Sequence, residues 1–372
     1  MSNKILNSLA LGLAIAAFAG CASTRLPNPT DKVYAGCKPE LFVRLDNTVT
    51  VPDGMSIDKN GDIIMAAPNY VRGDGNKNPP PSKLVRITAK GEVSDWFTAL
   101  PLHAETKEVH PMGMEFGPDG NLYVADNQYF ANKEYKSRLL RVVVENGKPV
   151  RCEVAADGFK LANAVRWNGN ACYVSDTFFD LKDKKNQSGV YRLTMKEMKA
   201  GKVTLKPNAS DSRLVAQYTS KDLDPKGATA GADGVCIDSK GNLYCGNFGD
   251  GVISRTKFCS LTGKPVSQQI VIDSPAIECC DGIVCDQKTD RIYITNSKNN
   301  SIHVYDIRKN TLQTLWVNDD NDGATGLLDQ PCEPLVYKGD LIIVNFDMSF
   351  PGLKNQKDDE VHTISKITLP KD

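Results

Sequence analysis

The fold is decided by residues 232–248, ADGVCIDSKGNLYCGNF. Two short apolar runs flank the turn Ser239-Lys240-Gly241-Asn242, and glycine and asparagine are the residues that positive-φ turn positions favour. The second run ends in Asn247. This order of strand, tight turn and strand predicts a β-hairpin.

The same phrase occurs five more times in the chain and is therefore an internal repeat. The copies are PDGMSIDKNGDIIMAAP from Pro52, PMGMEFGPDGNLYVADN from Pro111, ANAVRWNGNACYVSDT from Ala162, CDGIVCDQKTDRIYITNS from Cys280 and CEPLVYKGDLIIVNFD from Cys332. The second residue of each copy serves as an anchor, and successive anchors are 48 to 70 residues apart. Such spacings are typical of four-stranded propeller blades with loops of variable length.

A further pair of strands follows five of the hairpins, whereas the last hairpin is followed only by HTISKITL, residues 362–369. We expect the missing outer strand to come from ELFVRLD, residues 40–46, because this pairing closes the ring and leaves no free sheet edge. The sequence therefore predicts an all-β fold over residues 40–372. This fold is a six-bladed β-propeller with four-stranded blades, whose ring is closed by pairing of the N- and C-terminal strands. The polar stretch 196–227 is expected to be an insertion on one face.

The first twenty residues predict export. Lys4 precedes an apolar run that is too short to cross a bilayer, and this run ends in small residues before Cys21. Residues 1–20 resemble a bacterial lipoprotein signal peptide, and residues 21–39 are expected to be a tether. We expect lipidation at Cys21, an anchor in the outer membrane of the bacterial cell envelope, and a domain on either its periplasmic or its surface side. An ordinary secretory signal with an incidental cysteine is the alternative.

The composition argues against nucleic acid as a partner and does not decide whether the cysteines form disulfides. The 45 basic and 45 acidic residues balance without long blocks of either sign, so nucleic acid is not expected as a partner. We expect a monomer. The ten cysteines besides Cys21 are enough for five bridges in an exported protein, although several also suit free buried thiols. The adjacent Cys279 and Cys280 are expected to form a vicinal disulfide or to be paired elsewhere.

Propeller geometry predicts where polar residues gather. The start of each inner strand and the end of the next strand lie on one face, so the anchors should ring one mouth of the tunnel. The anchors are Asp53, Met112, Asn163, Asp233, Asp281 and Glu333, joined by residues that end the second strands, among them Asp176, Asn247 and Asn296. Converging carboxylates and amides suit a divalent cation with oxygen ligands, although each residue alone also suits a turn cap.

At these positions the chain resembles the family of senescence marker protein (regucalcin) and gluconolactonase, six-bladed propellers with one divalent cation in the tunnel. The family's metal ligands are a Glu, an Asn and an Asp of the first, third and fourth blades. The matching residues here are Asp53, Asn163 and Asp233, in PDGM, LANA and ADGV. The resemblance covers all six blades and is strongest around Asp233. Asp53 is one methylene shorter than the family's Glu, and Ala164 stands where glycine is usual.

The resemblance implies a metal-dependent hydrolase whose small-molecule substrate is a lactone or a related sugar-derived ester. A cation, calcium or alternatively zinc or manganese, would polarise the carbonyl while Asp233 or His110 accepts a proton from water. His110 stands where the family often has Asn, and it equally suits a surface role in holding a loop. Asp281 and Glu333 exceed the family pattern; they suit either completion of the coordination shell or another ligand.

Other functions remain open at this stage. The chain has no Gly-x-Ser-x-Gly signature, and its four histidines lack metal-pair spacing, so a serine hydrolase and a zincin are disfavoured. A propeller also suits a non-catalytic envelope lipoprotein that binds a glycan, a peptide or a protein partner. A third interpretation is a lyase or synthase of the streptogramin lyase or strictosidine synthase type.

Overall fold

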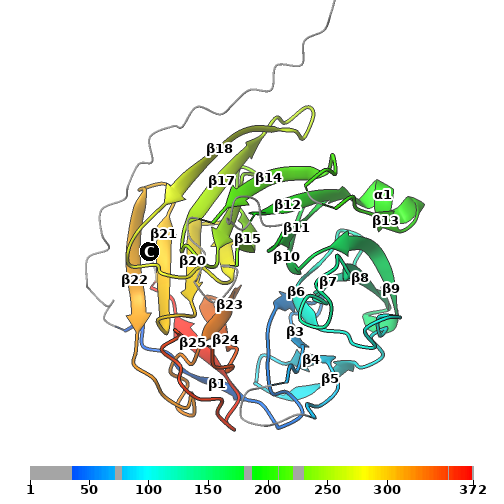
Figure 1. Ribbon diagram of the computed structural model, residues 1–372. Helices are drawn as coiled ribbons and strands as arrows, with labels where there is room; N and C mark the ends of the chain where they lie inside the picture. Colours follow the sequence, from blue (N-terminus) through cyan, green and yellow to red (C-terminus); the bar gives the residue numbers. More distant parts are fainter. Residues whose placement is uncertain are drawn as a thin grey trace, which may run out of the picture.

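The computed structural model describes residues 36–71, 78–179, 187–207, 209–220, 230–350 and 352–370. In this part of the chain six sheets stand around a central opening as the blades of a propeller (Figure 1). The predicted all-β, six-bladed propeller is confirmed. The predicted signal peptide and Cys21 lie outside the described residues.

The blades follow one another along the chain and are numbered here in that order. Blade 1 contains β2 (Met55–Ile57), β3 (Ile63–Ala67), β4 (Lys83–Ile87) and β5 (Val93–Phe97). Blade 2 contains β6 (Pro111–Phe116), β7 (Leu122–Asp126), β8 (Ser137–Glu145) and β9 (Lys148–Phe159). Blade 3 contains β10 (Ala162–Asn168), β11 (Ala171–Asp176), β12 (Gln187–Thr194) and β14 (Leu214–Thr219).

The second half of the ring repeats this arrangement. Blade 4 contains β15 (Ala232–Ile237), β16 (Leu243–Asn247), β17 (Ile253–Phe258) and β18 (Pro265–Ile272). Blade 5 contains β19 (Ile283–Asp286), β20 (Arg291–Asn296), β21 (Ser301–Asp306) and β22 (Thr311–Val317). Blade 6 contains β23 (Pro331–Tyr337), β24 (Asp340–Asn345), β25 (Thr363–Thr368) and β1 (Glu40–Arg44).

The hairpin of β15 and β16 shows how the repeated phrase folds. Ile237 of β15 lies opposite Leu243 of β16, and Gly241 takes the left-handed conformation with φ 78°. The Asp238 carboxylate accepts hydrogen bonds from the backbone N–H groups of Lys240 and Asn242, at 3.0 and 2.8 Å. An aspartate placed before a Gly-containing turn thus ties the turn to the end of its own strand.

The ring closes as predicted from the sequence. Strand β1 pairs antiparallel with β25, with Glu40 opposite Lys366 and Arg44 opposite Thr363. The two strands come from opposite ends of the described chain, so blade 6 joins the first and last strands in one sheet (Figure 1). Cys37, within the predicted tether, is 1% exposed and packs in a core cluster with residues of blades 5 and 6.

The polar stretch 196–227 is not the single insertion on one face that the sequence predicted. Its described part includes most of the helix α1 (Met195–Ala200), whose start is capped by Thr194 and Glu197 in a capping box. Strand β13 (Val203–Thr204) then adds a fifth strand to blade 2 by pairing in parallel with β9, and β14 completes blade 3. This segment therefore links two neighbouring blades at their outer edges.

Hydrophobic side chains fill the space between neighbouring blades. One cluster contains Tyr123 of blade 2 and Val174 and Tyr191 of blade 3, none of them more than 1% exposed. Burial of apolar surface at roughly 25 cal/mol per Å² is the main force that holds such sheets together. The close packing fixes the inner strands, which carry the residues that face the tunnel.

The ten cysteines in the described part of the chain form no disulfides. The expectation that Cys279 and Cys280 would be bridged is therefore wrong. Their side chains have different surroundings: Cys279 lines the central cavity, whereas the Cys280 sulfur packs against Gly246. Among the described residues, no helix has the length and apolar character needed to cross a membrane.

Candidate active site

Glycines beside the anchors allow the inner strands of neighbouring blades to approach closely. A Cβ atom on Gly234 would lie 2.5 Å from the carbonyl oxygen of Asp281, and one on Gly54 would lie 2.5 Å from that of Met112. The Gly234 N–H also donates a hydrogen bond to the Asp281 carbonyl at 3.2 Å. Backbone contact between blades therefore draws the anchors around a narrow axis.

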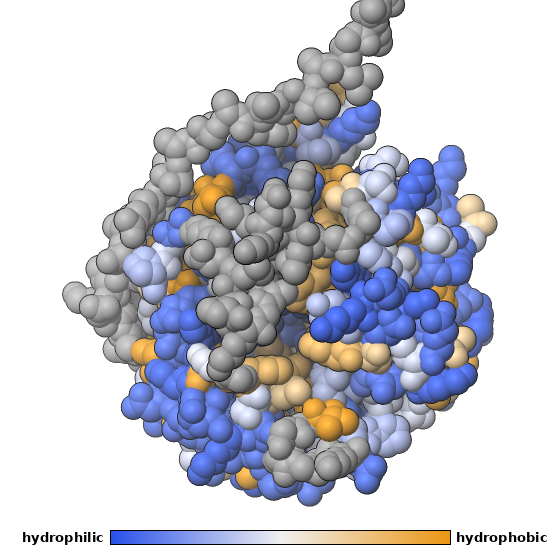
Figure 2. Space-filling model, in the orientation of Figure 1, coloured by the Kyte–Doolittle hydropathy of each residue, from blue (hydrophilic) through white to orange (hydrophobic). Residues whose placement is uncertain are grey.

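Five of the six predicted anchors line one cavity of about 930 Å³, namely Met112 and four polar residues. Asp53 precedes β2, Asn163 lies in β10, Asp233 lies in β15 and Asp281 precedes β19, and all four line this cavity. The structure thus brings together the three residues that the family resemblance singles out, together with Asp281. Hydrophobic residues gather around the middle of the face shown in Figure 2.

Burial raises the pKa of all three carboxylates in this cavity, and the charge of Asp281 raises the pKa of Asp53 and Asp233 further. Burial, and then the charge of Asp281, raises the pKa of Asp53 well above its ordinary value. Burial, and then Asp281 and Asp53, also raises the pKa of Asp233 well above its ordinary value, against the effect of a hydrogen bond from Asn163. The pKa of Asp281 is raised to about 7, chiefly by burial, although Ser297 donates a hydrogen bond of 2.6 Å to this carboxylate. Protons or a cation must therefore balance this charge.

Glu333 joins these carboxylates electrostatically but is not among the residues that line the cavity. Its carboxylate accepts a hydrogen bond of 2.6 Å from the Arg166 guanidinium, and the two side chains are 8% and 10% exposed. The buried Glu115 also interacts with Arg166. We refer to Asp53, Asp233, Asp281 and Glu333 as the central cluster, in which Arg166 supplies one positive charge.

Three residues that end second strands do not line the cavity, contrary to the sequence prediction: Asp176, Asn247 and Asn296. Asn127, which follows β7 directly, does line it. Asp176 accepts hydrogen bonds from the backbone N–H groups of Leu161 and Lys160 at 2.7 and 3.0 Å. Asn247 accepts one from the Asp250 N–H, and the Asn296 amide donates to the Ala276 carbonyl. These side chains satisfy the backbone of adjacent loops, which is the turn-capping role that the sequence left open.

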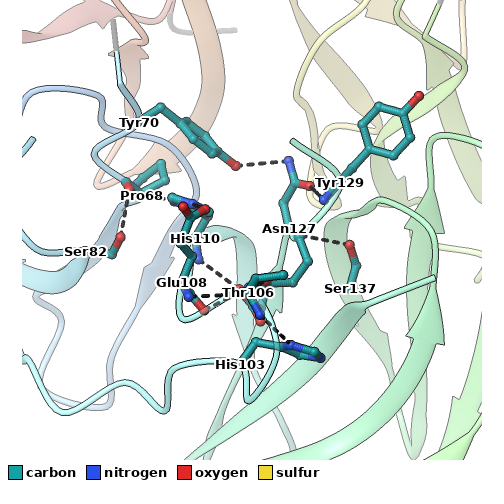
Figure 3. Close-up of polar contacts among 12 residues, drawn as sticks. Pro68, Tyr70, Ser82, His103, Thr106, Glu108, His110, Asn127, Tyr129 and Ser137 are labelled. Carbon is teal, nitrogen blue, oxygen red and sulfur yellow. Dashed lines mark hydrogen bonds and ion pairs between the residues drawn. The ribbon is translucent and has the colours of Figure 1, made fainter. Parts of the chain in front are cut away.

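His110 does not face the cavity either. One ring nitrogen lies 3.1 Å from the Pro68 carbonyl oxygen and the other 2.9 Å from the Glu108 carboxylate. The ring stacks on Tyr70 with centroids 4.4 Å apart, and Figure 3 shows it next to Pro68 and Glu108. Because both nitrogens are occupied, the histidine holds a loop, and its predicted role as a base is not supported by this geometry.

An aromatic wall around the cavity was not expected from the sequence. Each of blades 1, 2, 3, 4 and 6 has one aromatic residue that lies within three positions after its second strand and lines the cavity: Tyr70, Tyr129, Phe178, Phe248 and Phe346. The rings of Tyr129 and Phe178 stack with centroids 4.6 Å apart and an interplanar angle of 8°. The recurrence of an aromatic residue one to three positions after the second strand was the signal in the sequence that could have revealed this wall.

A tighter group of acids lies outside the cavity. Among the described residues, the one set of three His, Cys, Asp or Glu side chains with ligand atoms all within 4.8 Å of one another is Asp329, Asp347 and Asp359. We call this set the blade 6 triad. It combines the side-chain type and the spacing needed to hold a metal ion.

Comparison with known proteins supports the fold rather than a sequence family. No protein-family model and no curated protein sequence matches the chain. A gluconolactonase from Xanthomonas campestris has a TM-score of 0.50 at 12% identity, over 92% of this chain and 97% of its own. Regucalcin from Agrobacterium tumefaciens, described as a calcium-binding protein, has a TM-score of 0.53 at 14% identity, over 89% and 96% of the two chains.

The same fold also occurs with other chemistry. Streptogramin B lyase has a TM-score of 0.50 at 14% identity, over 91% of this chain and 100% of its own. At such low identity a structural match establishes the architecture, and the activity has to be argued from the residues in the cavity. The protein thus shares the six-bladed propeller fold of regucalcin and gluconolactonase.

Proposed function

We propose that the central cavity is the active site of a metal-dependent hydrolase that acts on a lactone or a related sugar-derived ester. The observation that carries this proposal is the arrangement of Asp53, Asn163, Asp233 and Asp281 in one cavity of about 930 Å³. A cavity of this volume suits a small molecule, and carboxylates surrounded by aromatic rings are typical of ligand sites.

The donor set fits a divalent cation. Asp53 and Asp233 are buried carboxylates with raised pKa values, and the Asn163 amide donates a hydrogen bond to Asp233, so residues of three blades with potential oxygen ligands line the same cavity. These three residues would hold the cation, calcium most readily and zinc or manganese alternatively. When bound, it would supply Lewis acidity toward a carbonyl oxygen and balance the negative charge.

The side chains around the proposed cation position would accept the proton from water and bind the substrate. Asp281 lies next to Asp233, and its hydrogen bond from Ser297 fixes the orientation of its carboxylate, which suits it to take a proton from an attacking water molecule. We therefore assign the proton acceptor to Asp233 or Asp281 in place of His110. Tyr129 and Phe178 offer apolar faces on which a ring-shaped substrate can pack and exclude water.

The test combines metal content with activity on a panel of simple lactones. For the purified full chain we expect metal-dependent hydrolysis and a bound divalent cation that chelator removes. Asp233→Asn should lower kcat/KM by roughly a hundredfold or more, because several kcal/mol of transition-state stabilisation depend on the cation. Asp319→Asn is the matched control, since the side chain of Asp319 is fully exposed and does not line the cavity.

Two outcomes would contradict the proposal. Hydrolysis that is unchanged after chelation, or equal in Asp233→Asn and the wild type, would remove the metal-dependent mechanism. A chain that binds no cation and hydrolyses no lactone would favour the non-catalytic propeller that binds a glycan, a peptide or a protein partner.

The protein is further proposed to be an envelope lipoprotein anchored through Cys21. The motif that supports this assignment lies before the propeller, and it leaves the cavity independent of the anchor. Mass spectrometry of the mature N-terminus from bacterial membranes should find an acylated Cys21. A mature chain that begins at another residue, or that carries an unmodified cysteine, would contradict the anchor.

A further inference from the structure

Three loops of blade 6 bring the triad together. Asp329 lies two residues before β23, Asp347 two residues after β24, and Asp359 in the loop that leads to β25. Their ligand atoms all lie within 4.8 Å of one another. Three like charges at this separation repel strongly unless something between them carries positive charge.

Asp329 is the member of the triad whose carboxylate most clearly lacks hydrogen-bond donors or positive charges around it in the described part of the chain. It is 1% exposed, and both of its carboxylate oxygens are buried without a hydrogen-bond partner among the described residues. Burial, followed by the charges of Asp347 and Asp359, raises its pKa to about 9. Because an unpartnered buried carboxylate is costly, the position calls for a ligand that the described residues do not supply.

The neighbouring carboxylate is held in place for such a ligand. Asp347 accepts a hydrogen bond of 3.1 Å from the Asp359 N–H at one oxygen, and its other oxygen lies 2.8 Å from a ring nitrogen of His362. Asp347 and His362 are both 1% exposed. A carboxylate that is oriented by an imidazole in this way is typical of the surroundings of a metal ligand.

We propose that Asp329, Asp347 and Asp359 form a second cation site, distinct from the central cluster, which binds a divalent cation with oxygen ligands and favours calcium. The three side chains offer only oxygen atoms, which suits a hard cation and disfavours metals that prefer sulfur or imidazole. The site is separate from the proposed catalytic centre, and its existence does not depend on the proposed hydrolase activity.

The position of the triad gives this cation a structural task. Gln330 follows Asp329, Phe346 and Met348 flank Asp347, and all three of these neighbours line the central cavity. The Met348 N–H donates a hydrogen bond of 2.6 Å to the Gln330 side chain, so the two loops are already tied together. A cation held by the triad would therefore fix the wall of the cavity that blade 6 contributes.

The experiment measures binding of calcium alone to the full chain by equilibrium dialysis. We expect Asp359→Asn and Asp329→Asn each to lose one bound calcium ion per chain relative to the wild type. Asp319→Asn, which removes an exposed acid from the neighbouring loop, should retain it. Should Asp329→Asn fail to fold, the more exposed Asp359→Asn carries the test.

A second readout follows the loop itself. Lys357 is exposed two residues before Asp359, so calcium should slow tryptic cleavage after Lys357 in the wild type and in Asp319→Asn, but not in Asp359→Asn. Equal calcium stoichiometry in the wild type and both triad variants would overturn the second site. Asp233→Asn separates the two proposals, because it should leave the calcium ion at the triad and the protection of Lys357 unchanged.

Discussion

The central cluster and the blade 6 triad are two groups of crowded acids that differ in origin and in compensation. The central cluster takes its members from four blades, lies around a cavity of about 930 Å³ and includes a buried ion pair to Arg166. The triad comes from the loops of one blade, its ligand atoms lie within 4.8 Å of one another, and the carboxylate oxygens of Asp329 have no hydrogen-bond partner among the described residues.

This difference separates two tasks for a bound cation. A catalytic cation needs open coordination positions and space for a substrate, which a cavity walled by several blades provides. A structural cation is best held by a compact set of ligands that leaves no room for other molecules. The central cluster therefore suits a cation that a substrate can reach, and the triad suits a cation that is enclosed by protein ligands.

Removal of the counter-charge of the central cluster should have the largest effect. In Arg166→Met, Glu333 and Glu115 lose their shared positive partner, and we expect the free energy of unfolding to fall by about 3–5 kcal/mol, as for other broken buried ion pairs. Denaturant unfolding measures this change. Adding Glu333→Gln to Arg166→Met removes one of the two unpaired buried charges. The double variant should therefore regain part of the lost free energy of unfolding.

The single variant Arg166→Met also tests the contrast between the central cluster and the triad. If Arg166→Met alone were as stable as the wild type, the central cluster would not depend on its ion pair, and the contrast with the triad would disappear. Calcium should not rescue Arg166→Met fully, because Glu333 lies outside the residues that line the cavity.

The fold was predictable because its signal repeats. Six copies of one hairpin, each with a turn that its own Asp, Asn and Gly residues support, locate the blades without knowledge of long-range contacts. Even the closure of the ring by residues 40–46 followed from the count of strands. The link through α1 and β13 could not be predicted, because its pairing with β9 depends on the position of a neighbouring blade.

The candidate site was predictable only in part. The anchors Asp53, Asn163 and Asp233 reach one cavity because equivalent positions on inner strands meet at the axis. The prediction for Asp176 was wrong because a side chain at the end of a second strand can turn to backbone N–H groups as easily as to the tunnel. The blade 6 triad was missed because Asp329 and Asp359 come from loops whose paths no repeat pattern describes, although Asp347 ends the sixth copy of the repeat.

Asp176 is a buried acid in a third kind of environment. Its replacement has the smallest expected effect on the free energy of unfolding. Its oxygens are satisfied by backbone N–H groups, yet burial raises its pKa to about 7. The equivalent strand-ending positions of blades 4, 5 and 6 carry asparagine, namely Asn247, Asn296 and Asn345, so an amide fits this type of site.

The raised pKa of Asp176 in the folded chain determines the direction in which its contribution to stability changes with pH. Below pH 4 the carboxyl of Asp176 is protonated in both the folded and the unfolded chain, whereas between about pH 4 and pH 7 only the unfolded chain ionises readily. The contribution of Asp176 to stability is therefore lost as the pH rises through this range. The stability of Asp176→Asn relative to the wild type should increase by about 1–3 kcal/mol between pH 4 and pH 8, measured by denaturant unfolding in chelator. A constant difference across this range would show that backbone N–H groups alone compensate the charge, and that a buried carboxylate in this propeller needs no cation when its hydrogen bonds are complete.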